Sequence, residues 1–105
     1  MLALENLESI GLDHNDFKNV PEPILTIPNL KRLKLNNNEL TDLKFINKRI
    51  EGLESIYLYS NELKQIDCEL ENLVNLKELL IFDNEIDSIP DCIGSLTNLE
   101  KLEIW

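Results

Sequence analysis

The stretch Leu30–Leu40, LKRLKLNNNEL, combines two structural signals. Leu33 and Leu35 alternate with Lys34, as side chains do along a half-buried strand. Asn38 follows where the chain must leave that strand, and an asparagine amide can hydrogen-bond the backbone of a turn. An eleven-residue unit of this kind cannot bury its leucines alone, so we expect similar units to pack on either side of it.

Related stretches recur at a constant spacing of 23 residues, without an insertion or a deletion. They start at Leu7, Leu30, Leu53, Leu76 and Leu99. The repeated pattern L-x-x-L-x-L-x-x-N-x-L indicates a tandem array, and it resembles the leucine-rich repeat family. The resemblance implies an α/β fold, a right-handed solenoid shaped as a horseshoe arc. A short parallel β-sheet would line its concave face, and short helical, 3₁₀ or extended segments its convex face.

The repeats predict one domain over residues 1–105, with about four and a half repeats. Stability of such an array comes from the interfaces between neighbouring repeats. The strand expected near Leu99 has no later repeat to cover it. Two explanations stay open at this point: the chain is a fragment of a longer array, or this end packs against a second copy.

Apolar residues recur at seven positions of each repeat and predict a buried stripe along the solenoid. One of these, position 14, holds Val20, Leu43, Ile66 and Ile89. The pattern breaks at Asn47, where other repeats have Ile or Leu, and we expect Phe45 or Ile46 to fill that part of the core. The first convex segment carries three prolines within residues 21–28, which predicts an extended chain or a 3₁₀ turn.

Asparagine occupies position 9 in each complete repeat. In the resembling family these residues form a ladder of amides that bond neighbouring backbone groups. Polar backbone inside the coil must be paired, so we interpret them as structural residues. They are Asn15, Asn38, Asn61 and Asn84.

Side chains that alternate with the core positions must face the concave surface. Both tyrosines and the only tryptophan fall there. Exposed apolar patches of this kind generally mark a binding surface, although aromatic residues also favour strands and stack across them. The predicted partner-binding residues are Tyr57, Tyr59, Leu80, Phe82, Trp105, Arg32 and Lys34.

The net charge of −10 argues against binding to nucleic acid or to an anionic membrane, and it is compatible with a basic protein partner. Position 10 is acidic in every complete repeat. This column suggests a rim for a basic partner or a divalent cation, or simply a solvated turn. Its members are Asp16, Glu39, Glu62 and Glu85.

Cys68 and Cys92 stand at positions 16 and 17 of successive repeats, where they could be neighbours on the convex side, and we expect them to be reduced, partly buried thiols. Extracellular members of the resembling family usually carry cysteine-rich caps, and neither end of this chain has one. There is also no signal-peptide pattern and no glycosylation sequon. We therefore expect a cytoplasmic, intracellular protein. Two cysteines and the distant His14 predict no metal site, and no cofactor is expected.

Catalysis finds no support, because the chain has one histidine and no recognisable nucleophile or phosphate-binding motif. The favoured function is a non-enzymatic protein–protein interaction module that binds a protein partner through its concave face. One alternative is the recognition or regulatory part of a larger enzyme, such as a ubiquitin ligase, kinase or phosphatase regulator. Another is a homo-oligomer that assembles through its uncapped C-terminal edge, formed by Leu99, Leu102, Ile104 and Trp105.

Overall fold

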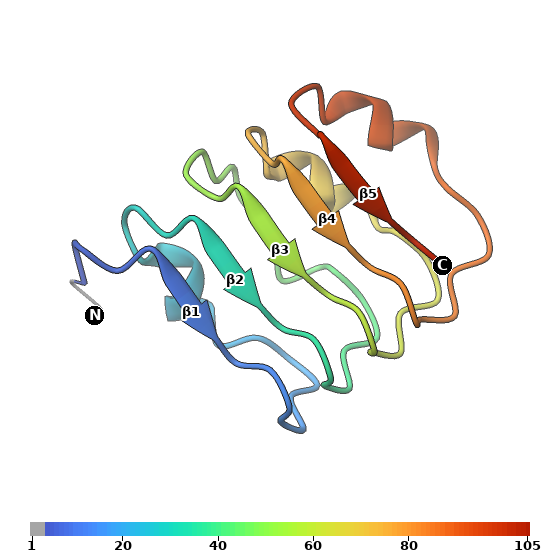
Figure 1. Cartoon of the computed structure of the whole chain (residues 1–105), viewed down its shortest axis with the longest axis horizontal. Coiled ribbons are helices and arrows are strands. Elements are labelled where there is room, and N and C mark those ends of the chain that lie inside the picture. The colour runs from blue at the N-terminus through green and yellow to red at the C-terminus, as the bar shows by residue number, and fades with distance from the viewer. Residues whose placement is uncertain (1–3) are drawn as a thin grey trace.

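A computed structural model of the chain describes residues 4–105 as a stack of similar turns around one parallel sheet. Its strands lie side by side in chain order (Figure 1). They are β1 (Ser9–Gly11), β2 (Arg32–Lys34), β3 (Ser55–Tyr57), β4 (Glu78–Leu80) and β5 (Lys101–Glu103). Each strand from β1 to β4 pairs with the residues 23 positions later, so that Leu33 is opposite Ile56 and Ile56 opposite Leu79. The solenoid predicted from the repeats is confirmed.

Backbone pairing continues beyond the three-residue strands. The N–H of Leu35 donates to Tyr57 O at 2.8 Å, and that of Leu58 donates to Leu80 O at 2.7 Å. The bonds join the same positions of successive repeats. A slip of one residue would turn the apolar side chains of a strand from the core to the solvent. The register of each repeat to the next is therefore fixed.

The convex segments contain 3₁₀ turns, and no α-helix occurs within residues 4–105. These turns are η1 (Glu22–Thr26), η2 (Cys68–Asn72) and η3 (Asp91–Ser95). Proline in the first turn of η1 fits the predicted 3₁₀ conformation. The second repeat has only a short turn, in which the Ile46 N–H donates to Leu43 O. Ile46 is fully buried while Asn47 is exposed, so Ile46 supplies the core volume that Asn47 lacks.

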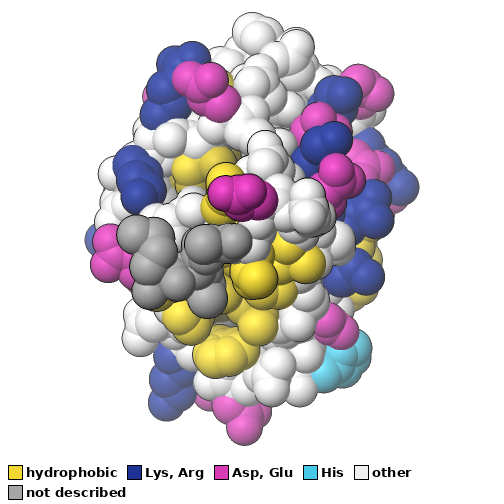
Figure 2. Space-filling model, turned by 90° about the vertical axis from the view of Figure 1, so that its left-hand side faces the viewer, with side chains coloured by type: hydrophobic (Ala, Val, Ile, Leu, Met, Phe, Trp, Pro, Cys, Tyr) yellow, Lys and Arg dark blue, Asp and Glu magenta, His cyan; other side chains and the backbone are white. Residues whose placement is uncertain are grey.

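The buried stripe is complete in the middle of the array and open at its two ends. Leu33, Ile56 and Leu79 have no exposed surface. Ile89 is 48% exposed, so its predicted burial is wrong, because no described residue packs over that side. Leu102, on the edge that the sequence predicts to be uncovered, is 37% exposed. The β1 end, which faces the viewer in Figure 2, also shows a hydrophobic patch between charged side chains. Leu4 is 46% exposed there.

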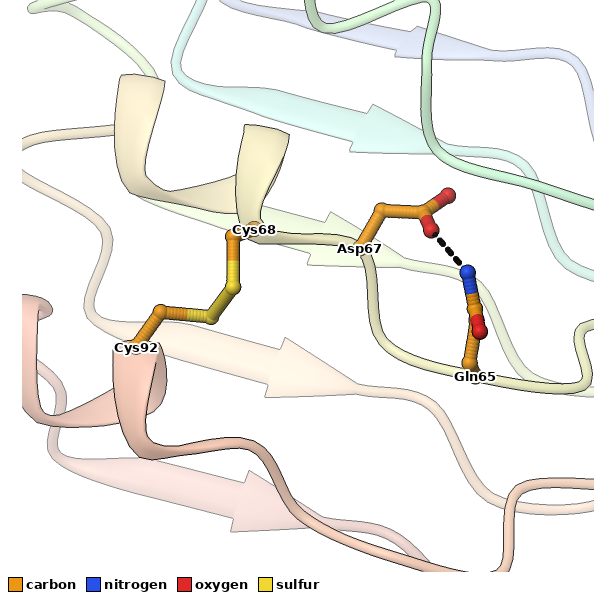
Figure 3. The surroundings of a disulfide bond; sticks show 4 residues. All are labelled: Gln65, Asp67, Cys68 and Cys92. Carbon is orange, nitrogen blue, oxygen red and sulfur yellow. Dashed lines mark hydrogen bonds between the residues drawn. A yellow bond between two sulfur atoms is a disulfide. The ribbon is translucent and has the colours of Figure 1, made fainter.

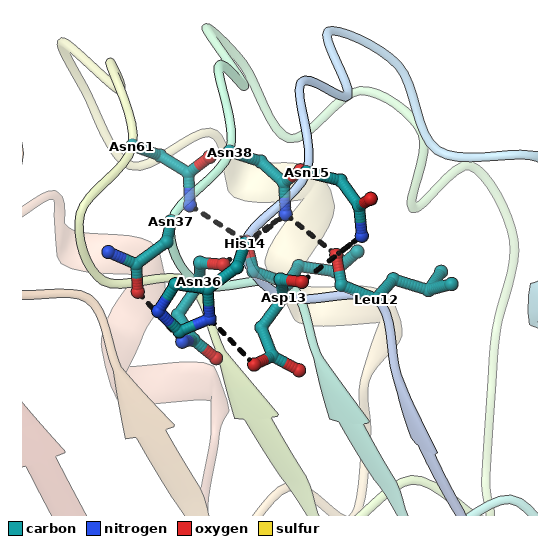
Figure 4. Close-up of polar contacts among 9 residues, drawn as sticks. Leu12, Asp13, His14, Asn15, Asn36, Asn37, Asn38 and Asn61 are labelled. Carbon is teal, nitrogen blue, oxygen red and sulfur yellow. Dashed lines mark hydrogen bonds and ion pairs between the residues drawn. The ribbon is translucent and has the colours of Figure 1, made fainter.

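Buried and half-buried asparagines connect the turns of the solenoid (Figure 4). The Asn61 amide nitrogen donates to Leu58 O in its own repeat and to Leu35 O in the preceding one, each at 3.0 Å, and its Oδ1 accepts from the Leu40 N–H. Asn38 and Asn84 repeat this arrangement. Asn15 is exposed and bonds only Leu12 O and Asp13 O of its own turn.

Asn61→Ala should therefore destabilise the fold much more than Asn15→Ala. The first change orphans buried backbone groups in two repeats, each worth roughly 1–3 kcal/mol, so we expect a loss of about 3 kcal/mol in the free energy of unfolding. The second should cost about 1 kcal/mol or less, because water replaces an exposed bond. Urea unfolding of both variants would measure the difference. Equal losses would contradict a role of Asn61 in linking repeats.

The two cysteines form a disulfide that joins η2 to η3, so the predicted reduced thiols are wrong (Figure 3). Cys68 is also exposed rather than partly buried. Their Cα atoms lie 5.8 Å apart, within the range that a disulfide requires, because the two 3₁₀ turns stack one repeat above the other. Beside the bridge, Asp67 accepts hydrogen bonds from the Leu43 N–H and from Gln65, which ties the start of η2 to the preceding repeat.

Opening this bridge should lower the stability of the chain without changing its fold. The bridge spans 24 residues, and closing a loop of that size contributes about 3 kcal/mol in the chain-entropy model. We expect the Cys68→Ser/Cys92→Ser double variant to lose that amount in urea unfolding. The wild-type chain in reductant should match the double variant, and the variant itself should not respond to reductant. A wild-type midpoint that reductant leaves unchanged would refute the prediction.

Candidate functional site

An aromatic cluster lies on the face of the sheet opposite the 3₁₀ turns, which we call the concave face. The rings of Tyr59 and Phe82 stack with their centroids 4.6 Å apart and their planes 4° from parallel. Tyr57 lies 6.2 Å from Tyr59 at a tilt of 37°. Leu80 is paired in register with Tyr57, and all four side chains are half-buried. The structure thus brings together four of the predicted partner-binding residues.

Trp105 stands apart from this cluster at the β5 edge and is 85% exposed. It lines a hollow of about 590 Å³ together with Phe82, Ile89 and Leu102. Its indole makes no ring–ring contact with the described aromatic residues. The aromatic surface therefore consists of the packed rings of Tyr57, Tyr59 and Phe82 and, beyond them, the solvent-exposed ring of Trp105.

Two basic side chains adjoin the cluster from β2. The Arg32 guanidinium carbon is 5.8 Å from the Tyr57 ring centroid, a cation–π distance. Lys34 extends beside Gly11, whose missing side chain leaves it space. Within residues 4–105, neither Arg32 nor Lys34 forms an ion pair with a carboxylate. Both predicted residues therefore lie on the concave face with their charges available.

The turns that leave the strands have a repeated backbone conformation that the sequence patterns did not reveal. Position 8 adopts a positive φ, between 54° and 60°, in each complete repeat. The residues are His14, Asn37, Ser60 and Asp83. Asn and Asp tolerate this region well, so their presence at position 8 was the sequence signal for this conformation. The conformation places the Ser60 hydroxyl where it donates to Asp83 Oδ2 at 2.7 Å, directly after the stacked Tyr59 and Phe82.

A polar group occupies the β1–β2 end of the same rim (Figure 4). His14 Nδ1 donates to Asp13 Oδ2 at 2.9 Å. This hydrogen bond lowers the pKa of the Asp13 carboxyl, with a backbone hydrogen bond and the charges of His14 and Lys34 acting in the same direction. The adjacent Asn36 is buried, and its amide donates to Asn37 Oδ1 at 2.9 Å. Asn36 Oδ1 has no partner among the described residues.

The acidic column at position 10 follows these turns at a fixed spacing. The backbone N–H of Glu62 donates to Leu40 O, and that of Glu85 donates to Leu63 O, so each residue is positioned by the preceding repeat. Both side chains are exposed. They form no ion pair within the described part of the chain. The rim beside the aromatic cluster is therefore negatively charged.

A second asparagine ladder, which the sequence patterns also left unassigned, supports the other end of the strands. The amides of Asn29, Asn75 and Asn98 donate to Glu5 O, Glu51 O and Val74 O, each in the preceding repeat. Gly52 interrupts the ladder in the second repeat. The recurrence of asparagine every 23 residues was the available signal. These amides satisfy backbone carbonyls and are structural.

A family model described as leucine-rich repeats, in two copies, matches residues 28–73. Together with the repeat register, this match decides the family. The chain belongs to the leucine-rich repeat family. Domains of this family generally mediate protein–protein interactions. No curated protein sequence matches the chain.

Solved structures of leucine-rich repeat proteins share the fold. An LRR protein of Leptospira interrogans is 27% identical with a TM-score of 0.70, over 95% of this chain and 31% of its own. The Arabidopsis receptor kinase HAESA, solved with the peptide hormone IDA and the co-receptor SERK1, is 33% identical with a TM-score of 0.74, over 95% of this chain and 18% of its own. An internalin of Listeria monocytogenes, 21% identical, shows the fold alone, with a TM-score of 0.56, over 91% of this chain and 33% of its own.

The leucine-rich repeat chain thus spans a third or less of the length of the proteins it resembles in structure. Among residues 4–105, none of the helical segments has the length and apolar character needed to cross a lipid bilayer. The concave face with its aromatic cluster is the surface on which this chain differs from repeat to repeat, and it is the candidate functional site.

Proposed function

We propose that the chain is a non-catalytic interaction module that binds a protein partner through the concave face. The stacked pair of Tyr59 and Phe82 carries this proposal. Aromatic residues surrounded by polar groups are typical of the centre of protein–protein interfaces. Here Tyr57, next to the pair, lies against the Arg32 guanidinium, and the carboxylate of Asp83, which accepts a hydrogen bond from Ser60, follows Phe82 in the chain. The rings offer apolar area to a partner, and the nearby charges orient that partner on the concave face.

The structural neighbours support binding of a polypeptide. HAESA was solved with a peptide hormone and a co-receptor. The chain covers 18% of that receptor kinase. In an alternative form of the proposal, the chain is therefore the recognition part of a larger regulatory protein. In either form the concave face does the binding, and the repeats themselves supply no catalytic group.

The charge distribution favours a partner with basic groups at the rim. Glu62, Asp83 and Glu85 follow the aromatic cluster, and the whole chain has a net charge of −10. The contact between Arg32 and the Tyr57 ring shows how a guanidinium packs on this face. An arginine or lysine of the partner would gain both an aromatic face and a nearby carboxylate. Such complementarity mainly raises the association rate and the specificity.

Removing the stacked rings should weaken partner binding strongly. We expect the Tyr59→Ala/Phe82→Ala variant to lose at least about 2 kcal/mol of binding free energy, roughly a thirtyfold loss of affinity, as at interface hot spots. The immobilised chain would first capture its partner from an extract of the source organism. The dissociation constants of the purified partner for the wild type and the variant would then be compared.

The matched control is the Glu22→Ala/Lys48→Ala variant. It changes two exposed residues of the convex segments and leaves the net charge unaltered. It should bind as the wild type does. Circular dichroism would establish that all three proteins are folded. If the partner binds the aromatic variant with wild-type affinity, the concave face is not the interface.

Self-association is a second candidate function, favoured by the exposed apolar side chains at the β5 edge. Leu102 and Ile89 are open to solvent there, beside Trp105. An uncovered parallel strand also presents unpaired backbone groups, which are a template for pairing with another chain. A second copy could bury both features in one contact.

For self-association, the average mass should rise above the monomer value of 12.2 kDa as the protein is concentrated. Multi-angle light scattering would measure this. Leu102→Lys places a charge on the edge strand and should keep the mass at the monomer value. Asn19→Lys, the matched control, adds one positive charge at an exposed site of the first repeat and should behave as the wild type. A wild-type mass that stays at the monomer value at every concentration would exclude this candidate.

The cytoplasmic location predicted from the sequence stays a proposal. In a cytosolic chain, glutathione and thioredoxin would keep Cys68 and Cys92 reduced. In an oxidising compartment the same residues would remain bridged. Alkylation of free thiols in freshly lysed cells, followed by mass spectrometry, would separate the two locations.

A further inference from the structure

Three metal-ligating side chains converge on the convex face, away from the aromatic cluster. The Sγ atoms of Cys68 and Cys92 and a carboxylate oxygen of Glu71 all lie within 4.8 Å of one another. A 3₁₀ helix has three residues per turn, so residues i and i+3 are eclipsed. Cys68 and Glu71 therefore share the face of η2 that is turned toward Cys92 on η3. The sequence patterns considered only cysteine and histidine donors and missed this carboxylate.

The fold holds these donors together independently of the sulfur–sulfur bond. Leu70 and Leu73 are buried and anchor η2 in the core, and Leu96 anchors the end of η3. Asp67 adds a bond from the start of η2 to the Leu43 N–H of the preceding repeat. Repeat stacking thus fixes the spacing of η2 and η3. Opening the disulfide would leave two thiols beside a carboxylate, at nearly the same positions.

We propose that Cys68, Cys92 and Glu71 bind one Zn²⁺ ion when the disulfide is reduced, so that the site holds either a disulfide or a metal ion. A dithiol reductant opens the bridge by thiol–disulfide exchange. It gives two electrons and two protons to the cysteine sulfurs and becomes a disulfide itself. Zn²⁺ then displaces the two thiol protons and forms two Zn–S bonds and one Zn–O bond. Water completes the four ligands.

The dimensions of the site fit this ion. Zn–S bonds of about 2.3 Å and Zn–O bonds of about 2.0–2.2 Å place the ligands of a tetrahedral ion roughly 3.5–3.8 Å apart. The three donors converge within 4.8 Å, so rotation of the side chains suffices to reach that spacing. Two thiolates select Zn²⁺ over Mg²⁺ and Ca²⁺, which prefer oxygen ligands.

The charges and the exposure of the site also favour a cation. Glu69 and Asp91 lie in the first turns of η2 and η3 beside the cysteines, without serving as ligands in the proposed site. They raise the local concentration of divalent ions. Cys68 and Glu71 are exposed, which gives both the reductant and the ion access. The bound ion would keep η2 and η3 linked where a disulfide does not survive.

The test uses Co²⁺ as a spectroscopic probe in place of Zn²⁺. The full chain is reduced with dithiothreitol, freed of it under argon, and titrated with Co²⁺. We expect one equivalent to bind, with thiolate charge-transfer absorption in the near ultraviolet and the visible bands of a tetrahedral ion, and Zn²⁺ to displace it. The oxidised chain should give neither signal. Circular dichroism would follow the fold throughout.

Variants distinguish a metal site that includes Glu71 from metal binding by the two cysteine thiols alone. Cys68→Ser should strongly lower the charge-transfer absorption, because one of the two sulfur ligands is lost. Glu71→Gln should weaken binding by at least roughly tenfold, a loss that even outer-shell changes reach at metal sites. Glu69→Gln is the matched control, with the same change of charge on the same helix, and should bind Co²⁺ as the wild type does. The proposal is overturned if the reduced wild type gives no charge-transfer absorption, or if Glu71→Gln binds as tightly as Glu69→Gln.

Discussion

The asparagine amides at position 9 of the second, third and fourth repeats form the interactions on which the rest of the structure depends. Each turn of the solenoid leaves backbone carbonyls and N–H groups inside the coil, where water cannot reach them. Asn38, Asn61 and Asn84 each bond the backbone of their own repeat and of the preceding one. The leucines provide apolar area. The amides supply hydrogen-bond partners for the buried backbone groups and fix the orientation of one repeat on the next.

This fixed orientation explains how a regular scaffold carries an individual surface. Because every strand is in register with the residues 23 positions away, the same positions always meet across the sheet. The concave face can then vary freely while the core stays constant. In this chain the variation leads from Arg32 over Tyr57 to the stacked Tyr59 and Phe82. The same stacking brings Cys68 and Cys92 together on the opposite face, although neither contributes to the core.

The sequence allowed most of the scaffold to be predicted, and parts of the candidate site. The replacement of a core position by Phe45 or Ile46 was expected, and Ile46 fills it. The redox state of the cysteines was not, because the distance between two convex segments depends on how tightly the repeats stack. Likewise, Ile89 reads as a core residue by its position and is half exposed, since a pattern shows which side a residue faces but not what covers it.

The sequence by itself determined the repeat length, the strand register and the residues that face the concave surface. These follow from periodicity, which is a local property of the chain and is repeated with every unit. Only the tertiary structure decided that Tyr59 stacks on Phe82, that Ser60 orders Asp83, and that Glu71 lies beside the two cysteines. Those contacts depend on side-chain rotamers and on the spacing between successive turns, and the sequence pattern determines neither of these.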